Sequence, residues 1–143
     1  MNKAVLISIH PEWCKHIFID QDKKYEVRKR APLLKTPYKV YVYCTLREPY
    51  LHYGNGFFSG AFNGLVMGEF ICIHNWERGA PWYNQTNGTC LTAKQLNDYA
   101  NGKGLVFMEI KDPILYIKPK ELKEFDVNRP PQSFQFIKEL EDG

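Results

Sequence analysis

The sequence predicts an α+β domain, a mixed β-barrel of about six strands with two or three short helices. The chain has 143 residues, of which 44% are hydrophobic and 24% charged, and this is the size and composition of one globular domain. Strand-forming runs recur along the whole chain, and helical patterns interrupt them without the regular strand–helix alternation of a doubly wound sheet. We therefore expect a single domain over residues 1–143, with the helices inserted between the strands of one barrel.

Apolar or alternating runs rich in β-branched and aromatic residues predict the strands. The clearest is 39–45, whose faces carry Val40, Val42 and Cys44 on one side and Tyr41, Tyr43 and Thr45 on the other. The other predicted strands are 4–9, 23–30, 65–75, 104–110, a very short one at 114–117, and 133–137. We expect loops over 46–61, which is rich in glycine and aromatic residues, and over 76–90.

Helix signals occur at two places, and a weaker one follows. Pro11 suits the first turn of a helix, and apolar residues from Trp13 to Phe18 recur at helical spacing behind it. Thr92 and Gln95 form a capping box for a second helix, which Gly102 should end. Residues 120–125 predict one further helical turn.

Charge and cysteine content limit the function classes. The net charge is only +3, but seven basic residues and one acid lie between Lys23 and Lys39. The four cysteines are at least 18 residues apart, so we expect reduced, mostly buried thiols. Neither they nor the four histidines show metal-ligand spacing, and we expect no metal and no cofactor. We see no signal peptide and no apolar stretch long enough to span a membrane, which predicts a cytoplasmic protein without a membrane partner.

Five short motifs in a fixed order carry a resemblance to a known family. They are 6–11 (LISIHP), 21–28 (QDKKYEVR), 42–45 (VYCT), 66–70 (VMGEF) and 129–134 (RPPQSF). Together they resemble the ASCH domain of the PUA-like superfamily, and the last resembles an ending common among its phage and bacterial members. The family signature G-x-K-x-x-E-x-R is matched by Lys23, Glu26 and Arg28, whereas Gln21 stands where the family has glycine.

The resemblance implies a role connected with RNA or nucleotides. Some family members resemble RNA-binding modules. One bacterial branch hydrolyses the acetyl amide of N4-acetylcytidine with a lysine and a threonine three residues later. Lys23 fits that lysine, but Glu26 stands in place of the threonine, so this chain lacks the hydroxyl nucleophile at that position.

The predicted ligand-binding set has two cations and a carboxylate at its centre. Lys23 and Arg28 would hold a phosphate or a base edge, and Glu26 would accept from an exocyclic amine or act as a base. The remaining members of the set are Trp13, Tyr43, Thr45, Gln132 and Ser133. Each also has a structural interpretation, as a solvated ion pair, a core aromatic or a turn residue. Strict strand alternation would place Lys23 and Glu26 on opposite faces, so they converge only if Lys23 precedes the strand.

Four functions are compatible with these residues, and the sequence leaves open whether the protein is an enzyme. The first is a binding module for RNA or a nucleotide-like ligand. The second is a small hydrolase of a modified nucleoside amide, with Lys23 and Glu26 as its acid–base pair and water as nucleophile. A metal-dependent nuclease is favoured less because no carboxylate cluster at metal spacing is visible. The fourth is an interaction protein with no ligand chemistry.

Overall fold

The computed structural model describes residues 3–32, 34–47 and 62–141. The elements follow one another as β1 (Lys3–Ile9), α1 (Pro11–Phe18), β2 (Tyr25–Arg28), β3 (Tyr38–Cys44), β4 (Leu65–Arg78), α2 (Ala93–Ala100), β5 (Leu105–Lys120), a 3₁₀ turn η1 (Leu122–Phe125) and β6 (Phe134–Lys138). The predicted α+β composition, with six strands and two or three short helices, is confirmed.

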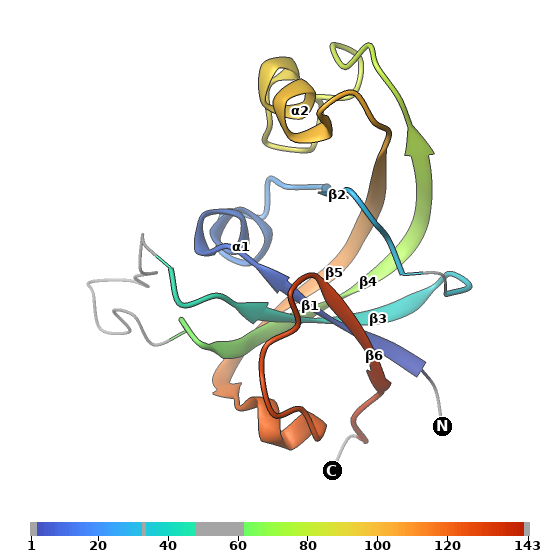
Figure 1. Ribbon diagram of the computed structural model, residues 1–143. Coiled ribbons are helices and arrows are strands. Elements are labelled where there is room, and N and C mark those ends of the chain that lie inside the picture. The colour runs from blue at the N-terminus through green and yellow to red at the C-terminus, as the bar shows by residue number, and fades with distance from the viewer. Residues whose placement is uncertain (1–2, 33, 48–61, 142–143) are drawn as a thin grey trace.

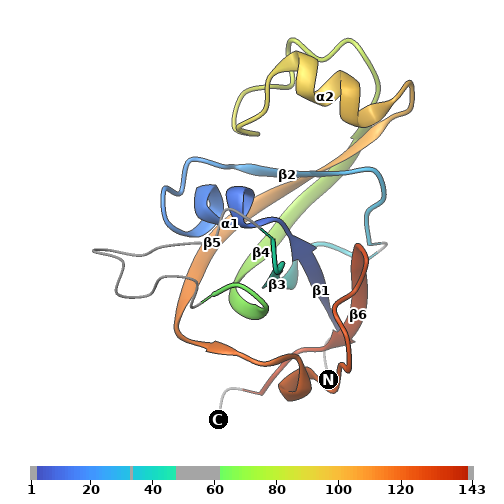
Figure 2. The ribbon, with the colours of Figure 1, turned by 60° about the vertical axis from the view of Figure 1, so that its left-hand side comes forward.

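The six strands form one mixed sheet in the order β2-β5-β4-β3-β1-β6 (Figure 1). β1 and β3 are parallel, and the other neighbouring pairs are antiparallel. The sheet curls strongly, and this brings its two edge strands, β2 and β6, toward the same side of the molecule (Figure 2). Among the described residues these two edges are not hydrogen-bonded to each other as strands. The curled sheet is therefore a barrel that does not close.

β3 is buried on both faces, and its alternation separates the two faces into different apolar clusters. Val40, Val42 and Cys44 belong to the cluster that packs against α1, together with β1, β4 and β5. Tyr41 and Tyr43 belong to a second cluster, which includes Phe125 of η1. Burial of the Tyr41 ring in this cluster stabilises the fold through the hydrophobic effect. Its hydroxyl keeps a polar partner, because it accepts a hydrogen bond from the Leu140 N–H at 2.9 Å.

Both predicted helices begin where the sequence signals stand. Pro11 is the first residue of α1, and its missing N–H has no helical partner to lose at that position. At α2 the Thr92 side chain accepts from the Gln95 N–H, while the Gln95 side chain accepts from the Thr92 N–H. α2 packs with β2 and with the adjoining parts of β4 and β5 in a third apolar cluster.

Two of the predicted elements need correction, and most of a third lies outside the described residues. The separate strands predicted at 104–110 and 114–117 are one strand, β5, because Asp112 takes a left-handed conformation (φ 52°) and lets the strand bend through Pro113. β4 continues to Arg78, so the predicted 76–90 loop begins within a strand. Most of the predicted loop over 46–61 lies outside the described residues. In the described part of the chain all four cysteines are free, three of them buried, and no helix is long and apolar enough to cross a membrane.

Candidate functional site

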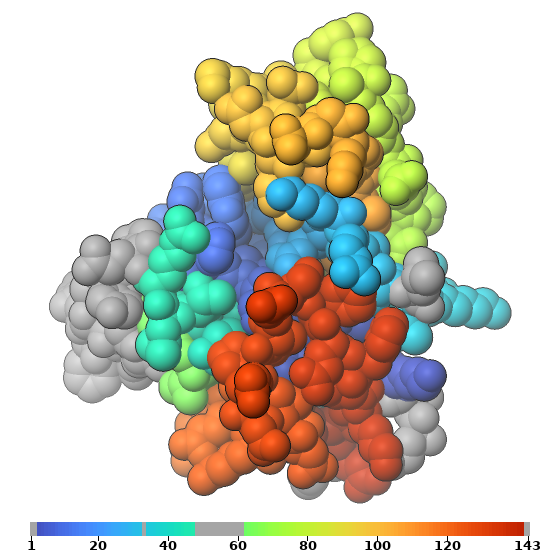
Figure 3. Space-filling model, in the orientation of Figure 1, coloured from blue at the N-terminus to red at the C-terminus, as the bar shows by residue number. Residues whose placement is uncertain are grey.

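A large cavity lies on the side of the molecule where the two edge strands approach each other. Its volume is about 970 Å³, and its walls come from the ends of β1 and β3, from α1, β2 and α2, and from the segment that leads into β6. Figure 3 shows this face, with α2 above, the end of β2 in the middle and the segment before β6 below. All eight predicted ligand-binding residues line the cavity: Trp13, Lys23, Glu26, Arg28, Tyr43, Thr45, Gln132 and Ser133.

The turn before β2 brings Lys23 to the same cavity as Glu26. Gln21, which stands where the family signature has glycine, takes a left-handed conformation (φ 55°) that glycine adopts freely. The Asp22 and Lys23 N–H groups then donate to the His16 carbonyl at 3.1 and 3.4 Å. Since β2 starts only at Tyr25, Lys23 precedes the strand. The alternation of side chains along a strand therefore does not apply to Lys23, and it can line the same cavity as Glu26.

The Lys23 ammonium is enclosed by protein groups. It donates to the Thr89 carbonyl at 2.5 Å, lies 5.2 Å from the centroid of the Trp13 ring, and is 3.9 Å from Glu26 Oε1. The residue is only 3% exposed. Burial lowers the pKa of Lys23, and the negative charge of Glu26 offsets part of that effect. The cavity floor therefore holds a buried amine whose charged form is less favoured than in water.

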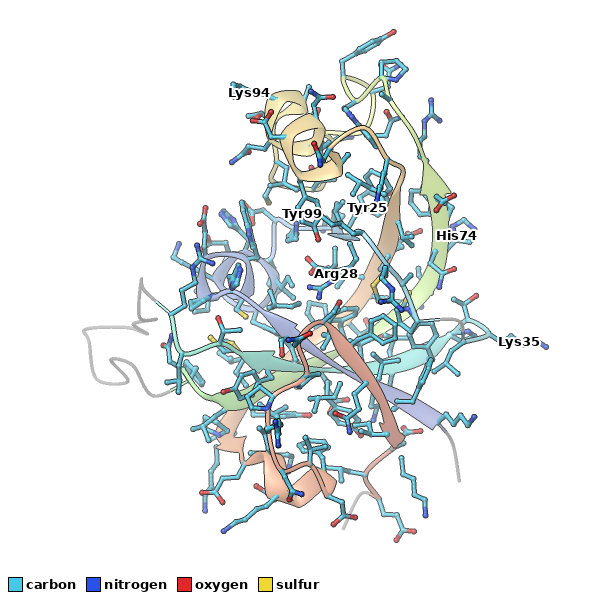
Figure 4. All side chains as sticks on the ribbon, in the orientation of Figure 1. Tyr25, Arg28, Lys35, His74, Lys94 and Tyr99 are labelled. Atoms are coloured by element: carbon cyan, nitrogen blue, oxygen red, sulfur yellow. The ribbon has the colours of Figure 1, made fainter. Side chains whose placement is uncertain are left out.

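Arg28 holds the Glu26 carboxylate from the other side. Its Nη1 donates to Glu26 Oε2 at 3.0 Å and to the Ser8 carbonyl at 3.1 Å. Its Nη2 donates to the Ser133 carbonyl at 3.2 Å and to Ser133 Oγ at 2.8 Å. These contacts occupy all four terminal N–H groups of the guanidinium. In Figure 4 Arg28 lies between β2 and the segment before β6. Its contacts indicate a clamp that positions Glu26, rather than a cation that is free to bind a ligand.

A second polar group lies on the wall formed by the ends of β1 and β3. Since these strands are parallel and in register at Ile9 and Cys44, the residues that follow them, His10 and Thr45, lie side by side. His10 Nδ1 is 3.3 Å from Thr45 Oγ1, and His10 Nε2 is 3.0 Å from Arg47 Nη1. An arginine can only donate, so Nε2 accepts, and the geometry fits a neutral imidazole with its proton on Nδ1. Partial burial and the charges of Arg47 and Arg28 lower the pKa of His10.

The remaining predicted residues line the cavity with fewer described contacts. Tyr43 is almost fully buried, and burial raises the pKa of its phenol. Trp13 is half-buried between Lys23 and the His16 ring, whose centroid is 5.9 Å away. Gln132 is exposed beside Ser133, at the cavity rim.

Several lining residues lie outside the predicted ligand-binding set, although two of them belong to the basic stretch between Lys23 and Lys39. They are His10 and Arg47 beside Thr45, Lys29 and Arg30 after β2, and Asp98 and Tyr99 on α2. The parallel pairing of β1 and β3 would have indicated His10, but no local pattern reveals that α2 covers the cavity. Among the described residues, five cationic and two acidic side chains line it, Lys23, Arg28, Lys29, Arg30 and Arg47 against Glu26 and Asp98, so this part of the lining suits an anion.

Comparison with known proteins identifies solved structures with a similar architecture. The chain matches no protein-family model and no curated protein sequence. Solved structures do resemble it. The ASCH protein from Zymomonas mobilis gives a TM-score of 0.72 at 20% identity, over 94% of this chain and 87% of that one.

Two variants of the Zymomonas mobilis protein give similar values. The variant with a serine replaced by alanine has a TM-score of 0.71 at 20% identity and covers 94% of this chain and 88% of its own. The variant with a tyrosine replaced by phenylalanine has a TM-score of 0.73 at 21% identity and covers 96% and 91%. The protein described here thus has the fold of the ASCH domain, which is the fold that the sequence resemblance predicted.

Proposed function

We propose that the protein is a binding module for RNA or a nucleotide-like ligand, and that the cavity between β2, α2 and the segment before β6 is its binding site. The observation that carries this proposal is the composition of the cavity. A buried lysine and a carboxylate lie 3.9 Å apart on its floor, with cationic side chains around them. A volume of about 970 Å³ is at the upper end of the range for sites that bind small ligands.

The groups divide into a floor and a rim with different tasks. On the floor, Lys23 would donate to a base carbonyl, and Glu26 would accept from an exocyclic amine. At the rim, Lys29, Arg30 and Arg47 are exposed and would contact phosphates. Tyr99 offers exposed ring surface against which a base could stack. Arg28 would contribute indirectly, because its terminal N–H groups hold Glu26, Ser8 and Ser133.

A labelled single-stranded RNA oligonucleotide, titrated at several salt concentrations, tests this proposal. We expect affinity to fall with salt, because bound phosphates release counterions. Arg30→Ala and Arg47→Ala should each reduce the slope of log affinity against log salt by about 1. Lys35→Ala is the matched control, since it removes an exposed cation that does not line this cavity (Figure 4). Affinity that is independent of salt, or equal effects of all three substitutions, would contradict the proposal.

One observation favours hydrolysis of a modified nucleoside amide as a second candidate. The buried Lys23 amine, whose pKa burial lowers, lies 3.9 Å from the Glu26 carboxylate, so a proton donor and a proton acceptor lie together on the cavity floor. Glu26 would take a proton from water as the oxygen attacks the acetyl carbon, and Lys23 would protonate the departing exocyclic amine. Acetate release from N4-acetylcytidine, lost in both Lys23→Met and Glu26→Gln, would support this function. Binding without turnover supports the module, whereas chelator-sensitive cleavage of RNA would indicate a nuclease instead.

A further inference from the structure

Three side chains that can ligate metals meet outside the cavity, behind Lys23. His16, Asp22 and Cys90 each bring one ligand atom into a group whose members lie within 4.8 Å of one another. They come from α1, from the turn before β2, and from the segment before α2. None of them lines the cavity described above. The sequence could not indicate this cluster, because 68 positions separate Asp22 from Cys90.

The donor atoms are an imidazole nitrogen, a carboxylate oxygen and a thiol sulfur. Zn²⁺ accepts this mixture in tetrahedral sites, whereas Ca²⁺ and Mg²⁺ prefer oxygen alone. Bond lengths of about 2.0–2.3 Å in a tetrahedron imply ligand atoms roughly 3.3–3.7 Å apart. The observed spacing needs only small side-chain movements to reach that range.

The cluster is also accessible and already ordered by its own contacts. His16 Nδ1 is 2.8 Å from Asp22 Oδ1 and 3.7 Å from Asp20 Oδ2. The His16 side chain is 30% exposed and that of Asp22 is 55% exposed, so an ion can reach them from solvent. Asp20, which also pairs with Lys15 at 2.8 Å, stands near enough to compete with water for a fourth position.

We propose that His16, Asp22 and Cys90 bind a Zn²⁺-type divalent ion that fastens the floor of the cavity. Asp22 directly precedes Lys23, and Cys90 directly follows Thr89, the residue whose carbonyl accepts from the Lys23 ammonium. An ion held by Asp22 and Cys90 would therefore join the chain segment that carries the amine to the segment that carries its acceptor. His16 adds α1 to the same junction, and its carbonyl already accepts from the Lys23 N–H. This inference does not depend on which ligand the cavity binds.

Cobalt provides a direct spectroscopic test. The untagged full-length chain is stripped of metal with a chelator under reducing conditions and titrated with Co²⁺. We expect one equivalent to bind, with a thiolate-to-cobalt charge-transfer band that Zn²⁺ then abolishes by displacement. Cys90→Ser should remove the band, although Cys14, Cys44 and Cys72 are still present. His16→Ala and Asp22→Asn should weaken binding by about tenfold or more, since even the loss of outer-shell partners costs that much.

His74→Ala is the matched control, because His74 is exposed and lies outside the cluster. It should bind Co²⁺ as the unchanged protein does. Zn²⁺ should raise the melting temperature of the unchanged protein and of His74→Ala, but not that of Cys90→Ser. Absence of the band in the unchanged protein, or its persistence in Cys90→Ser, would overturn the proposal. Should Cys90→Ser fail to fold, Asp22→Asn decides the question, since unchanged affinity in that variant is equally contradictory.

Discussion

Nη2 of Arg28 donates to Oγ of Ser133 at 2.8 Å and thereby joins the two edges of the open sheet. Arg28 is the last residue of β2, and Ser133 directly precedes β6. The same guanidinium reaches the Ser8 carbonyl on β1 and the Glu26 carboxylate. One side chain therefore bridges the seam that strand pairing leaves open and holds the carboxylate of the candidate site.

Removal of this clamp should destabilise the protein strongly. In the described part of the chain, Arg28→Ala leaves Glu26, which is 5% exposed, with the more distant Lys23 as its one ion-pair partner. We expect a loss of about 3 kcal/mol in the free energy of unfolding, measured by urea denaturation. Ser133→Ala, which removes a single hydrogen bond to the guanidinium, should cost about 1.5 kcal/mol. Arg28→Lys should not restore stability, because one ammonium cannot reach Ser8, Glu26 and Ser133 together.

A double substitution separates the cost of the lost clamp from the cost of the unpaired charge. Adding Glu26→Gln to Arg28→Ala removes the buried charge that the single variant leaves behind. We expect the double variant to recover about 1–2 kcal/mol relative to Arg28→Ala, whereas Glu26→Gln alone destabilises the protein. A double-mutant cycle from four denaturation curves gives the coupling energy directly. Simple additivity of the two changes would show that Arg28 and Glu26 do not act as a pair.

Gly68 of β4 lies close to β5 and to α1, away from the candidate site. A Cβ at this position of β4 would lie 2.4 Å from the Ile114 carbonyl oxygen and 2.7 Å from the Phe18 ring. Gly68→Ala should therefore force β4 away from β5 and α1, at a cost of about 3 kcal/mol or more in the free energy of unfolding. Gly79→Ala is the matched control, because nothing lies within 4 Å of the Cβ it would add. A Gly68→Ala variant as stable as this control would contradict the close approach.

Much of the fold could be predicted because local signals and tertiary packing agree. The alternation of β3 corresponds to two buried faces, and the capping box at Thr92 begins α2. The prediction failed at Asp112, where Asp-Pro indicated a break between strands. A left-handed residue at this point lets a single strand continue, and pairing with β4 on both sides of the bend stabilises that arrangement.

The lining of the candidate site was more predictable than the contacts that its side chains make. Lys23, Glu26 and Arg28 lie within six positions and line the cavity together, along with the other five predicted residues. The clamp role of Arg28 was not predictable, since its acceptors Ser8 and Ser133 come from distant strands. The cluster of His16, Asp22 and Cys90 was missed for the same reason. Long-range packing, rather than spacing, determines which groups each side chain meets.

The low pKa of His10 gives ligand binding an expected pH dependence. In the free protein, partial burial and the positive charges of Arg47 and Arg28 lower the pKa of His10 from its usual value, while Glu26 and Glu12 act weakly in the opposite direction. His10 Nε2 accepts from Arg47, a contact that protonation of the imidazole would break. A phosphate bound at this wall would accept from Arg47 in place of His10 and would stabilise the imidazolium, so ligand binding should raise the pKa of His10.

The sign of the effect follows from proton linkage. When the pKa of a group is higher in the complex than in the free protein, binding takes up a proton, and affinity increases as pH falls through the pKa of the complex. A dinucleotide with a single phosphodiester is the proper ligand, because its own charge does not change between about pH 7.5 and about pH 5.5. We expect tighter binding at the lower pH. In NMR spectra, the midpoint of the His10 titration should shift to higher pH when the protein is saturated with ligand. His10→Asn should bind at pH 7.5 but lose this pH dependence, whereas His74→Asn should keep it. A His10 curve that does not move with ligand would place the phosphate elsewhere in the cavity, beside Lys29 and Arg30 rather than Arg47.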